Sequence, residues 1–278
     1  MSRAKGYEDF GKSVFVEEML DAARLMSERG WAERNAGNMS CIIPGSDVVR
    51  YFDPDHVKRV FPLGLNMKEL SGMVILITAA GSYFRKLKID PAKGMGAVRV
   101  SLDGNRLELL WGFESGASPT SEMHMHFMGH IKRLKKELNH RVILHTHATN
   151  TIIMSANGAL DEKAFTRALW NMHSECVVVF PEGVGLVPWM VPGTQEISSA
   201  TAEKLEDFRL IIWPLHGIIA TGNSIDEAMG LIETVEKTAE IYIKSMGFAD
   251  SLKLLTDKQV LDTAARFNLK PRQGILEL

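Results

Sequence analysis

The sequence has little cysteine, no long apolar run and no excess of charge of either sign. Its two cysteines, Cys41 and Cys176, are too few for a disulfide framework, and both adjoin β-branched runs that predict burial. The most apolar stretch, residues 73–80, is far shorter than the roughly 20 residues that cross a bilayer, and the first residues lack the apolar region of a signal peptide. We therefore expect reduced thiols in a cytoplasmic protein that does not bind a membrane.

Charge is balanced along the chain. Lys and Arg number 32 against 34 Asp and Glu in 278 residues, which gives a formal net charge of -2. Duplex nucleic acids are bound mainly through Lys and Arg that neutralise phosphates, so this balance argues against a nucleic-acid partner and leaves anionic small molecules open. Hydrophobic residues at 45% and charged residues at 24% are enough to build a sizeable core and exclude a disordered or fibrous chain.

Nucleotide-binding glycine motifs of the forms G-x-G-x-x-G and G-x-x-x-x-G-K-[ST] are also missing. Extended runs at 97–102 and 106–113 are separated by Asp103-Gly104-Asn105. Asp-Gly between two such runs predicts a hairpin, because glycine supplies a positive φ without steric cost. The two strands must then be antiparallel, whereas a doubly wound dinucleotide-binding fold needs parallel strands.

Apolar periodicity and capping residues predict the remaining elements. Helices are expected at 14–29, 119–138, 149–156, 161–172, 194–208, 224–247 and 256–267. Further strands are expected at 39–43, 73–78, 141–148 and 176–180, followed by a strand-turn-strand unit at 210–220. Residues 44–71 carry Pro, Gly, Asp and Asn without a clear period, which predicts an irregular excursion outside the main sheet. No internal repeat is present, so we expect one domain over residues 1–278.

Two histidines two positions apart form a metal-ligand pattern. His145 and His147 stand in the strand-like run 142–148. Residues i and i+2 of a strand share one face, with Cα atoms about 6.6 Å apart, so both imidazoles can reach one ion. Two hydrogen-bonded core histidines explain an isolated H-x-H equally well.

His216 is a third candidate ligand. It stands where two apolar runs meet at Pro214 and Gly217, a bend from which a side chain can project into a cleft. Taken alone, it also fits an ordinary turn histidine. Three neutral imidazoles would leave zinc an open position, as in catalytic rather than structural sites.

Glu122 is the candidate carboxylate beside such a site. It falls in the first turn of the helix expected at 119–138, where backbone N–H groups and the helix dipole attract anions. Position alone equally suits a carboxylate that merely favours a helix N-terminus. His126 and His130 are spaced i, i+4 on the same helix, but no H-E-x-x-H glutamate accompanies them, so we expect them in helix packing or at the surface.

Two glycine-containing turns are candidate anion sites. Arg34-Asn35-Ala36-Gly37-Asn38 lies between the first helix and the first strand, and Thr78-Ala79-Ala80-Gly81-Ser82 follows an apolar strand. In such turns, backbone N–H groups can converge on an anion. An ordinary asparagine turn is the more common structure for the first run.

These motifs together resemble the class II aldolase/adducin-head family. The residues that carry the resemblance are Arg34-Asn35-Ala36-Gly37-Asn38, Pro119-Thr120-Ser121-Glu122, His145-Thr146-His147 and His216-Gly217. The similarity extends from about the first predicted helix to the last, and includes Leu109-Leu110-Trp111-Gly112, Val178-Val179-Phe180-Pro181 and Val187-Pro188-Trp189-Met190-Val191-Pro192-Gly193. It implies an α/β fold with three α/β/α layers around a mainly antiparallel central sheet, and retro-aldol cleavage of a sugar phosphate.

The resemblance also implies a cofactor, an assembly and residue roles. One zinc ion (Zn2+) per subunit would be held by His145, His147 and His216, in a homotetramer with sites near subunit interfaces. Glu122 would be the acid/base. Glu175 would reach a neighbouring subunit's site and assist proton transfer on the aldehyde side, although a charged residue without a role also fits its position at a strand start. The implied phosphate contacts are Asn35, Gly37, Asn38, Gly81 and Ser121.

Two positions depart from the family pattern. Ala36 replaces a usual glycine of the first loop, and Ala80 stands where a Ser-Gly step is usual. The second change removes one hydroxyl donor, for which the Gly81 N–H and Ser82 partly substitute.

Four other functions fit parts of the pattern. A related sugar-phosphate aldolase or a pentulose-phosphate 4-epimerase would share the metal site. A non-catalytic adducin-head-like interaction module would be expected to lack metal ligands, which are all present here. A zinc hydrolase would also use three histidines and an acid, but no hydrolase motif supports it.

Overall fold

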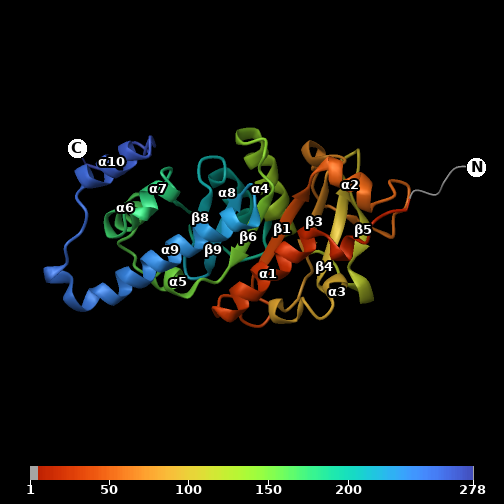
Figure 1. The fold of residues 1–278 in the computed structure, drawn as a ribbon, viewed down its shortest axis with the longest axis horizontal. Coiled ribbons are helices and arrows are strands. Elements are labelled where there is room, and N and C mark those ends of the chain that lie inside the picture. The colour runs from red at the N-terminus through yellow and green to blue at the C-terminus, as the bar shows by residue number, and fades with distance from the viewer. Residues whose placement is uncertain (1–5, 278) are drawn as a thin grey trace, which may run out of the picture.

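The computed structural model describes residues 6–277, and nine strands within them form one sheet (Figure 1). The strands are β1 (Asn38–Ile43), β2 (Arg59–Pro62), β3 (Val74–Thr78), β4 (Met95–Val100), β5 (Arg106–Gly112), β6 (Val142–Thr146), β7 (Gly185–Leu186), β8 (Leu210–Trp213) and β9 (Gly217–Gly222). Their order is β2-β5-β4-β3-β1-β6-β9-β8-β7, and only the β7–β8 pair is parallel. The expected α/β fold with a mainly antiparallel sheet is confirmed.

Helices cover both faces of the sheet. They are α1 (Val14–Glu28), α2 (Gly45–Tyr51), α3 (Pro91–Gly94), α4 (Met123–Lys136), α5 (Thr149–Ser155), α6 (Glu162–Met172), α7 (Glu175–Val179), α8 (Gln195–Lys204), α9 (Ile225–Ser245) and α10 (Asp257–Arg266), with short 3-10 turns η1 (Phe10–Lys12), η2 (Lys68–Leu70), η3 (Phe84–Lys86), η4 (Glu114–Gly116) and η5 (Met246–Ser251). None of the helices described is long and apolar enough to span a membrane.

Side-chain alternation along the strands divides the core between the two faces. In β6, Val142 and Leu144 join the apolar cluster formed with α1, α5, α6 and α9, whereas Ile143 joins the cluster beneath α4 and α8. In β1, Met39 and Cys41 likewise face the α1 side. Ser40, which lies between them, therefore faces α4, as the period of two in a strand requires.

The hairpin predicted at Asp103-Gly104-Asn105 is confirmed. β4 and β5 pair antiparallel on either side of it. Gly104 has a φ of +74°, and a Cβ placed there would lie 2.5 Å from the Lys68 nitrogen. A glycine is thus required both by the turn and by the approach of a second backbone segment.

Several expectations about secondary structure are wrong. Residues 176–179 of the run 176–180, expected as a strand, belong to helix α7, because this segment packs against α9 and α10 and the tertiary packing outweighs its β-branched composition. Within the segment 44–71, expected outside the main sheet, β2 pairs antiparallel with β5 as an edge strand, although the rest of the segment is α2, η2 and turns.

The helix expected from residue 119 begins only at Met123. Pro119 forms a β-bridge with Ala79, and the Thr120 N–H donates to the Thr78 carbonyl at 3.0 Å. These contacts extend the sheet beyond the end of β3, and the helix therefore begins later than expected. Glu122 is therefore the N-cap residue of α4 rather than a member of its first turn.

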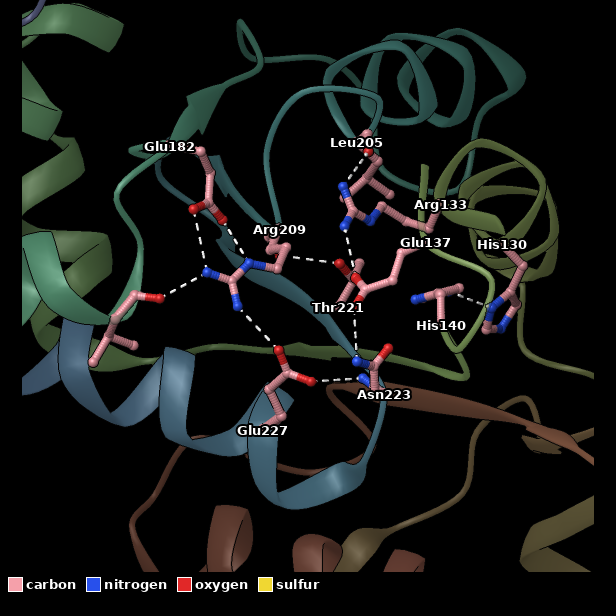
Figure 2. Close-up of polar contacts among 11 residues, drawn as sticks. His130, Arg133, Glu137, His140, Glu182, Leu205, Arg209, Thr221, Asn223 and Glu227 are labelled. Carbon is pink, nitrogen blue, oxygen red and sulfur yellow. Dashed lines mark hydrogen bonds and ion pairs between the residues drawn. The ribbon is translucent and has the colours of Figure 1, made fainter. Parts of the chain in front are cut away.

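A partly buried arginine next to β8 joins the end of α7 and the loop after it to the start of α9 (Figure 2). The Arg209 guanidinium donates to both carboxylate oxygens of Glu182, at 2.7 and 3.2 Å, and to Glu227 of α9 at 3.0 Å. It also donates to the Val179 carbonyl at 2.7 Å. One cation thus satisfies acceptors from the end of α7, the loop that follows it and the start of α9.

Replacing this cation should destabilise the fold. In Arg209→Met, two carboxylates lose their partner in a partly buried setting, which we expect to lower the free energy of unfolding by about 2–4 kcal/mol in urea titrations. Arg24→Met is the matched control, because Arg24 pairs with Glu28 on the exposed side of α1 and such pairs contribute little. Equal, small effects of both substitutions would contradict this role of Arg209.

Candidate metal centre and active site

The candidate site lies at the edge of the sheet that is formed by strand ends, where the neighbouring strands β3, β1 and β6 begin or end. β1 is antiparallel to both β3 and β6, with Asn38 opposite His145 at the start of β1. The turn that precedes β1 therefore lies beside the turns that follow β3 and β6. These turns carry most of the residues singled out in the sequence.

His145, His147 and His216 form a compact cluster. Each histidine offers one ring nitrogen to the cluster, and these three nitrogens all lie within 4.8 Å of one another. His145 is buried in β6 and His147 follows that strand, while His216 occupies the turn between β8 and β9. A Cβ on Gly217 would lie 2.4 Å from the Thr146 carbonyl oxygen, so glycine permits this turn to approach β6 closely.

Hydrogen bonds orient two of these imidazoles. His145 Nδ1 lies 3.1 Å from the Ile218 carbonyl and His147 Nδ1 lies 2.7 Å from Glu33 Oε1, so each Nδ1–H donates and each Nε2 keeps its lone pair. His216 Nδ1 is buried and has no hydrogen-bond partner among the described residues. Metal-ligating histidines usually have such oxygen partners behind the ring. The donor set therefore fits a metal ion, and the role of the three residues as its ligands stays a prediction.

Glu33 was missed by the sequence analysis. It immediately precedes the Arg34-Asn35 turn, is largely exposed, and contacts a histidine 114 residues further along the chain. A surface glutamate before a turn carries no pattern of its own. Only the pairing of strands far apart in the sequence brings it to His147.

Glu122 lies against the histidine cluster. The residue is only 8% exposed, and its carboxylate accepts a hydrogen bond from Asn38 Nδ2 at 2.8 Å and lies 3.7 Å from His145 Nε2. Burial raises the pKa of Glu122, while the hydrogen bond from Asn38 and the charges of His216 and His147 oppose that rise. A buried carboxylate with a raised pKa is suited to give and take protons.

The structure also brings the predicted anion-binding turns together. The Ala80 N–H donates to the Ser118 carbonyl at 2.9 Å, which holds the Gly81 turn against the Ser121 turn. A Cβ on Gly37 would lie 3.3 Å from Phe84, which follows the Gly81 turn. Asn35, Gly81 and Ser121 are exposed at this edge of the sheet.

Asn38 and Glu175 occupy different settings. The Asn38 side chain is buried in β1, and its amide is engaged at both ends by Glu122 and His126. Its predicted phosphate contact remains untested. Glu175 is exposed at the start of α7, and its side chain takes part in no hydrogen bond or ion pair with the other residues of 6–277.

Known proteins resemble this chain over nearly its whole length. The profile of the Class II Aldolase and Adducin N-terminal domain matches residues 17–243. A rhamnulose-1-phosphate aldolase of Listeria monocytogenes is 43% identical over 97% of this chain and 98% of its own length. A protein of the same name from Escherichia fergusonii is 39% identical over 98% and 100% of the two chains. The crystal structure of a sugar-phosphate aldolase from Thermotoga maritima superposes with a TM-score of 0.71 at 30% identity, covering 84% of this chain and 94% of that one.

Metal affinity should depend weakly on pH. Burial lowers the pKa of His145 to about 3 and that of His216 to about 4, so both stay neutral in mild acid. Between pH 7 and pH 5.5 we expect zinc affinity, measured by competition with a chromogenic chelator, to fall by at most about thirtyfold. A fall of about a thousandfold, as three imidazoles of ordinary pKa would give, would contradict this site. Circular dichroism at both pH values controls for unfolding.

Proposed function

Since the chain belongs to the family of class II aldolases and adducin N-terminal domains, we propose that it is a lyase that cleaves L-rhamnulose 1-phosphate reversibly to dihydroxyacetone phosphate and L-lactaldehyde. The observation that carries this proposal is the cluster of three imidazoles with the buried Glu122 carboxylate 3.7 Å from one of them. Its occurrence in a chain that matches rhamnulose-1-phosphate aldolases from end to end supports the choice of substrate.

We propose zinc as the cofactor, one ion per subunit. His145, His147 and His216 would hold it, because nitrogen donors suit zinc and three of them leave a position for substrate. Bound zinc would supply Lewis-acid chemistry to the substrate's oxygen atoms.

Proton transfer falls to two glutamates. When the C3–C4 bond of the ketose phosphate breaks, its electron pair stays with C3, and Glu122 would give C3 a proton to yield dihydroxyacetone phosphate. In the aldol direction the same carboxylate would remove that proton. Glu175 of a neighbouring subunit would take the proton of the C4 hydroxyl as the aldehyde forms.

Neutral donors would hold the substrate phosphate. Asn35, Gly37, Gly81 and Ser121 come from the turns gathered at the sheet edge, and Asn38 belongs to the same proposed set. Backbone N–H groups and hydroxyls can bind a phosphate without a cluster of cations. The balanced net charge of the chain agrees with this mode of binding.

A homotetramer would complete the site. Leu215, beside His216, is 63% exposed, and Trp189 and Val191 are 64% and 56% exposed in the loop that leads to Gly193 near Ser121. Large apolar side chains exposed around a polar site are typical of a surface that a partner covers. The assembly would reside in the cytoplasm, where the buried, unpaired thiols of Cys41 and Cys176 stay reduced.

Glu122→Gln should abolish turnover while leaving the metal bound. We expect kcat to fall by at least about a hundredfold, because the amide cannot exchange a proton with C3. The measurement is coupled detection of dihydroxyacetone phosphate from L-rhamnulose 1-phosphate and its diastereomers, beside zinc analysis. Glu69→Gln, an exposed site in η2, is the control. Equal turnover of both variants, or preference of the wild type for another isomer, would refute the assignment.

Glu175 should act across a subunit interface. Glu175→Gln alone should lower kcat, because each site then lacks its second proton acceptor. When Glu122→Gln and Glu175→Gln subunits are unfolded together and refolded as mixed tetramers, roughly a quarter of the sites should regain both carboxylates. Activity recovery is the measurement, with each variant refolded alone as the control. Mixed tetramers no more active than the separate variants would place Glu175 outside the site.

A further inference from the structure

A buried row of polar side chains runs between α4 and β1, outside the histidine cluster. Glu122, His126 and His130 are spaced four residues apart and lie on one face of the α4 region, while Asn38 and Ser40 lie on the facing side of β1. His126 and His130 are fully buried. Apolar side chains surround this row, so its polar groups have mainly one another as partners.

The contacts are continuous from end to end. Asn38 Nδ2 lies 2.8 Å from Glu122 Oε2, and Asn38 Oδ1 lies 2.5 Å from His126 Nε2. Ser40 Oγ lies 2.7 Å from His126 Nδ1 and 2.8 Å from His130 Nε2. The last contact joins His130 Nδ1 to His140 Nε2 at 2.8 Å. We call these six residues the buried polar chain: Glu122, Asn38, His126, Ser40, His130 and His140.

The ionised carboxylate gives the chain one direction. Glu122 can only accept, so Asn38 must turn its NH2 group toward it and its carbonyl toward His126. A neutral His126 then donates through Nε2 and accepts at Nδ1 from the Ser40 hydroxyl. The Ser40 oxygen in turn accepts from His130.

The far end follows the same rule. His130 donates through Nε2, so its Nδ1 accepts from His140 Nε2 (Figure 2). All three imidazoles therefore carry their proton on Nε2, the reverse of His145 and His147, whose Nδ1 donates. Burial lowers the pKa of His126 and His140 to about 3 and that of His130 far below its ordinary value, which agrees with neutral rings.

We propose that the buried polar chain positions the carboxylate of Glu122 for proton transfer, by fixing the Asn38 amide with its NH2 group toward that carboxylate. This inference rests on the proposed function of Glu122. The opposite amide orientation would set the Asn38 carbonyl against the carboxylate, and the Ser40 hydroxyl is the link through which His130 and His140 oppose that flip. Stability alone does not require such a row, because replacing both partners of a buried hydrogen bond by apolar groups of the same shape can leave stability nearly unchanged.

The chain runs along β1, from the edge of the sheet that carries the candidate metal site to the opposite edge. His140 lines a cavity of about 750 Å³ together with Ile43, Arg141 and Asn223, at the opposite end of β1 from the metal site. The positioning residues Ser40, His130 and His140 thus lie away from the substrate. Their effect must pass through His126 and Asn38.

Proton positions in the wild-type, zinc-loaded protein test the chain directly. Solid-state NMR of 15N-histidine-labelled protein, with resonances assigned by single histidine-to-glutamine variants, distinguishes Nδ1–H from Nε2–H rings. We expect His126, His130 and His140 to be neutral with Nε2–H. An Nδ1–H or doubly protonated ring at any of the three would overturn the proposal. This measurement does not depend on turnover, so an inactive wild type would refute the proposed function and leave the chain to be judged by its tautomers.

Ser40→Ala tests the consequence for catalysis. We expect kcat to fall about ten- to a hundredfold, with KM within about twofold of the wild type and zinc content unchanged. Exchange of the C3 proton of dihydroxyacetone phosphate with solvent should fall by the same factor, because that step uses Glu122 and not Glu175. Ser40→Thr keeps the hydroxyl and should recover most of the loss.

Ser198→Ala is the matched control. It removes another buried serine hydroxyl, which donates to the carbonyl of Thr194, the N-cap residue of α8, and is separate from the chain. We expect it to leave kcat and proton exchange unchanged. A folded Ser40→Ala variant with wild-type proton exchange would overturn the proposal, and if that variant does not fold, the wild-type tautomers decide.

Discussion

Antiparallel pairing of β1 with both of its neighbours is the constraint on which the site depends. It places the start of β1 beside the ends of β3 and β6, so that turns far apart in the sequence share one edge of the sheet. Two close backbone approaches follow. A Cβ on Gly37 would meet the His145 carbonyl oxygen at 3.0 Å, and one on Gly217 would meet that of Thr146 at 2.4 Å. Side chains at these positions would separate the turns and disperse the histidine cluster.

The alternation of side chains lets β1 take part in both the apolar core and the buried polar chain. On β1, Met39 and Cys41 pack into the core beneath α1, whereas Asn38 and Ser40 face α4. Every second residue of β1 thus meets every fourth residue of the α4 region. Burial then keeps the histidines between them neutral, and neutral rings make the hydrogen bonds directional. Electrostatics and packing are therefore not separate features of this region.

Much of this arrangement could be predicted from local patterns, and the exceptions have physical reasons. The H-x-H spacing, the Asp103-Gly104-Asn105 hairpin and the bend at His216 are short-range features, and the structure has each where expected. The run 176–180 was misassigned because packing against α9 and α10 overrides β propensity.

Contacts between segments far apart in the sequence could not be predicted either. Glu33 could not be connected with His147, nor Ser40 with His126 and His130, because nothing in a single sequence states which helix covers which strand. The i, i+4 spacing of the two helix histidines was visible and fitted packing, as their complete burial confirms. Their hydrogen bonds to the facing strand β1 could not be predicted from that spacing.

Two opposing effects act on the proton affinity of Glu122. Burial favours the neutral carboxyl group, whereas the Asn38 NH2 group favours the carboxylate. A dication held by the three nearby imidazoles would favour the carboxylate further. A carboxylate exposed to water would hold a proton too weakly to deliver it to carbon, and one buried without a donor would not release it. The balance between burial and a fixed donor would let a glutamate at this position serve both directions of the proposed reversible reaction.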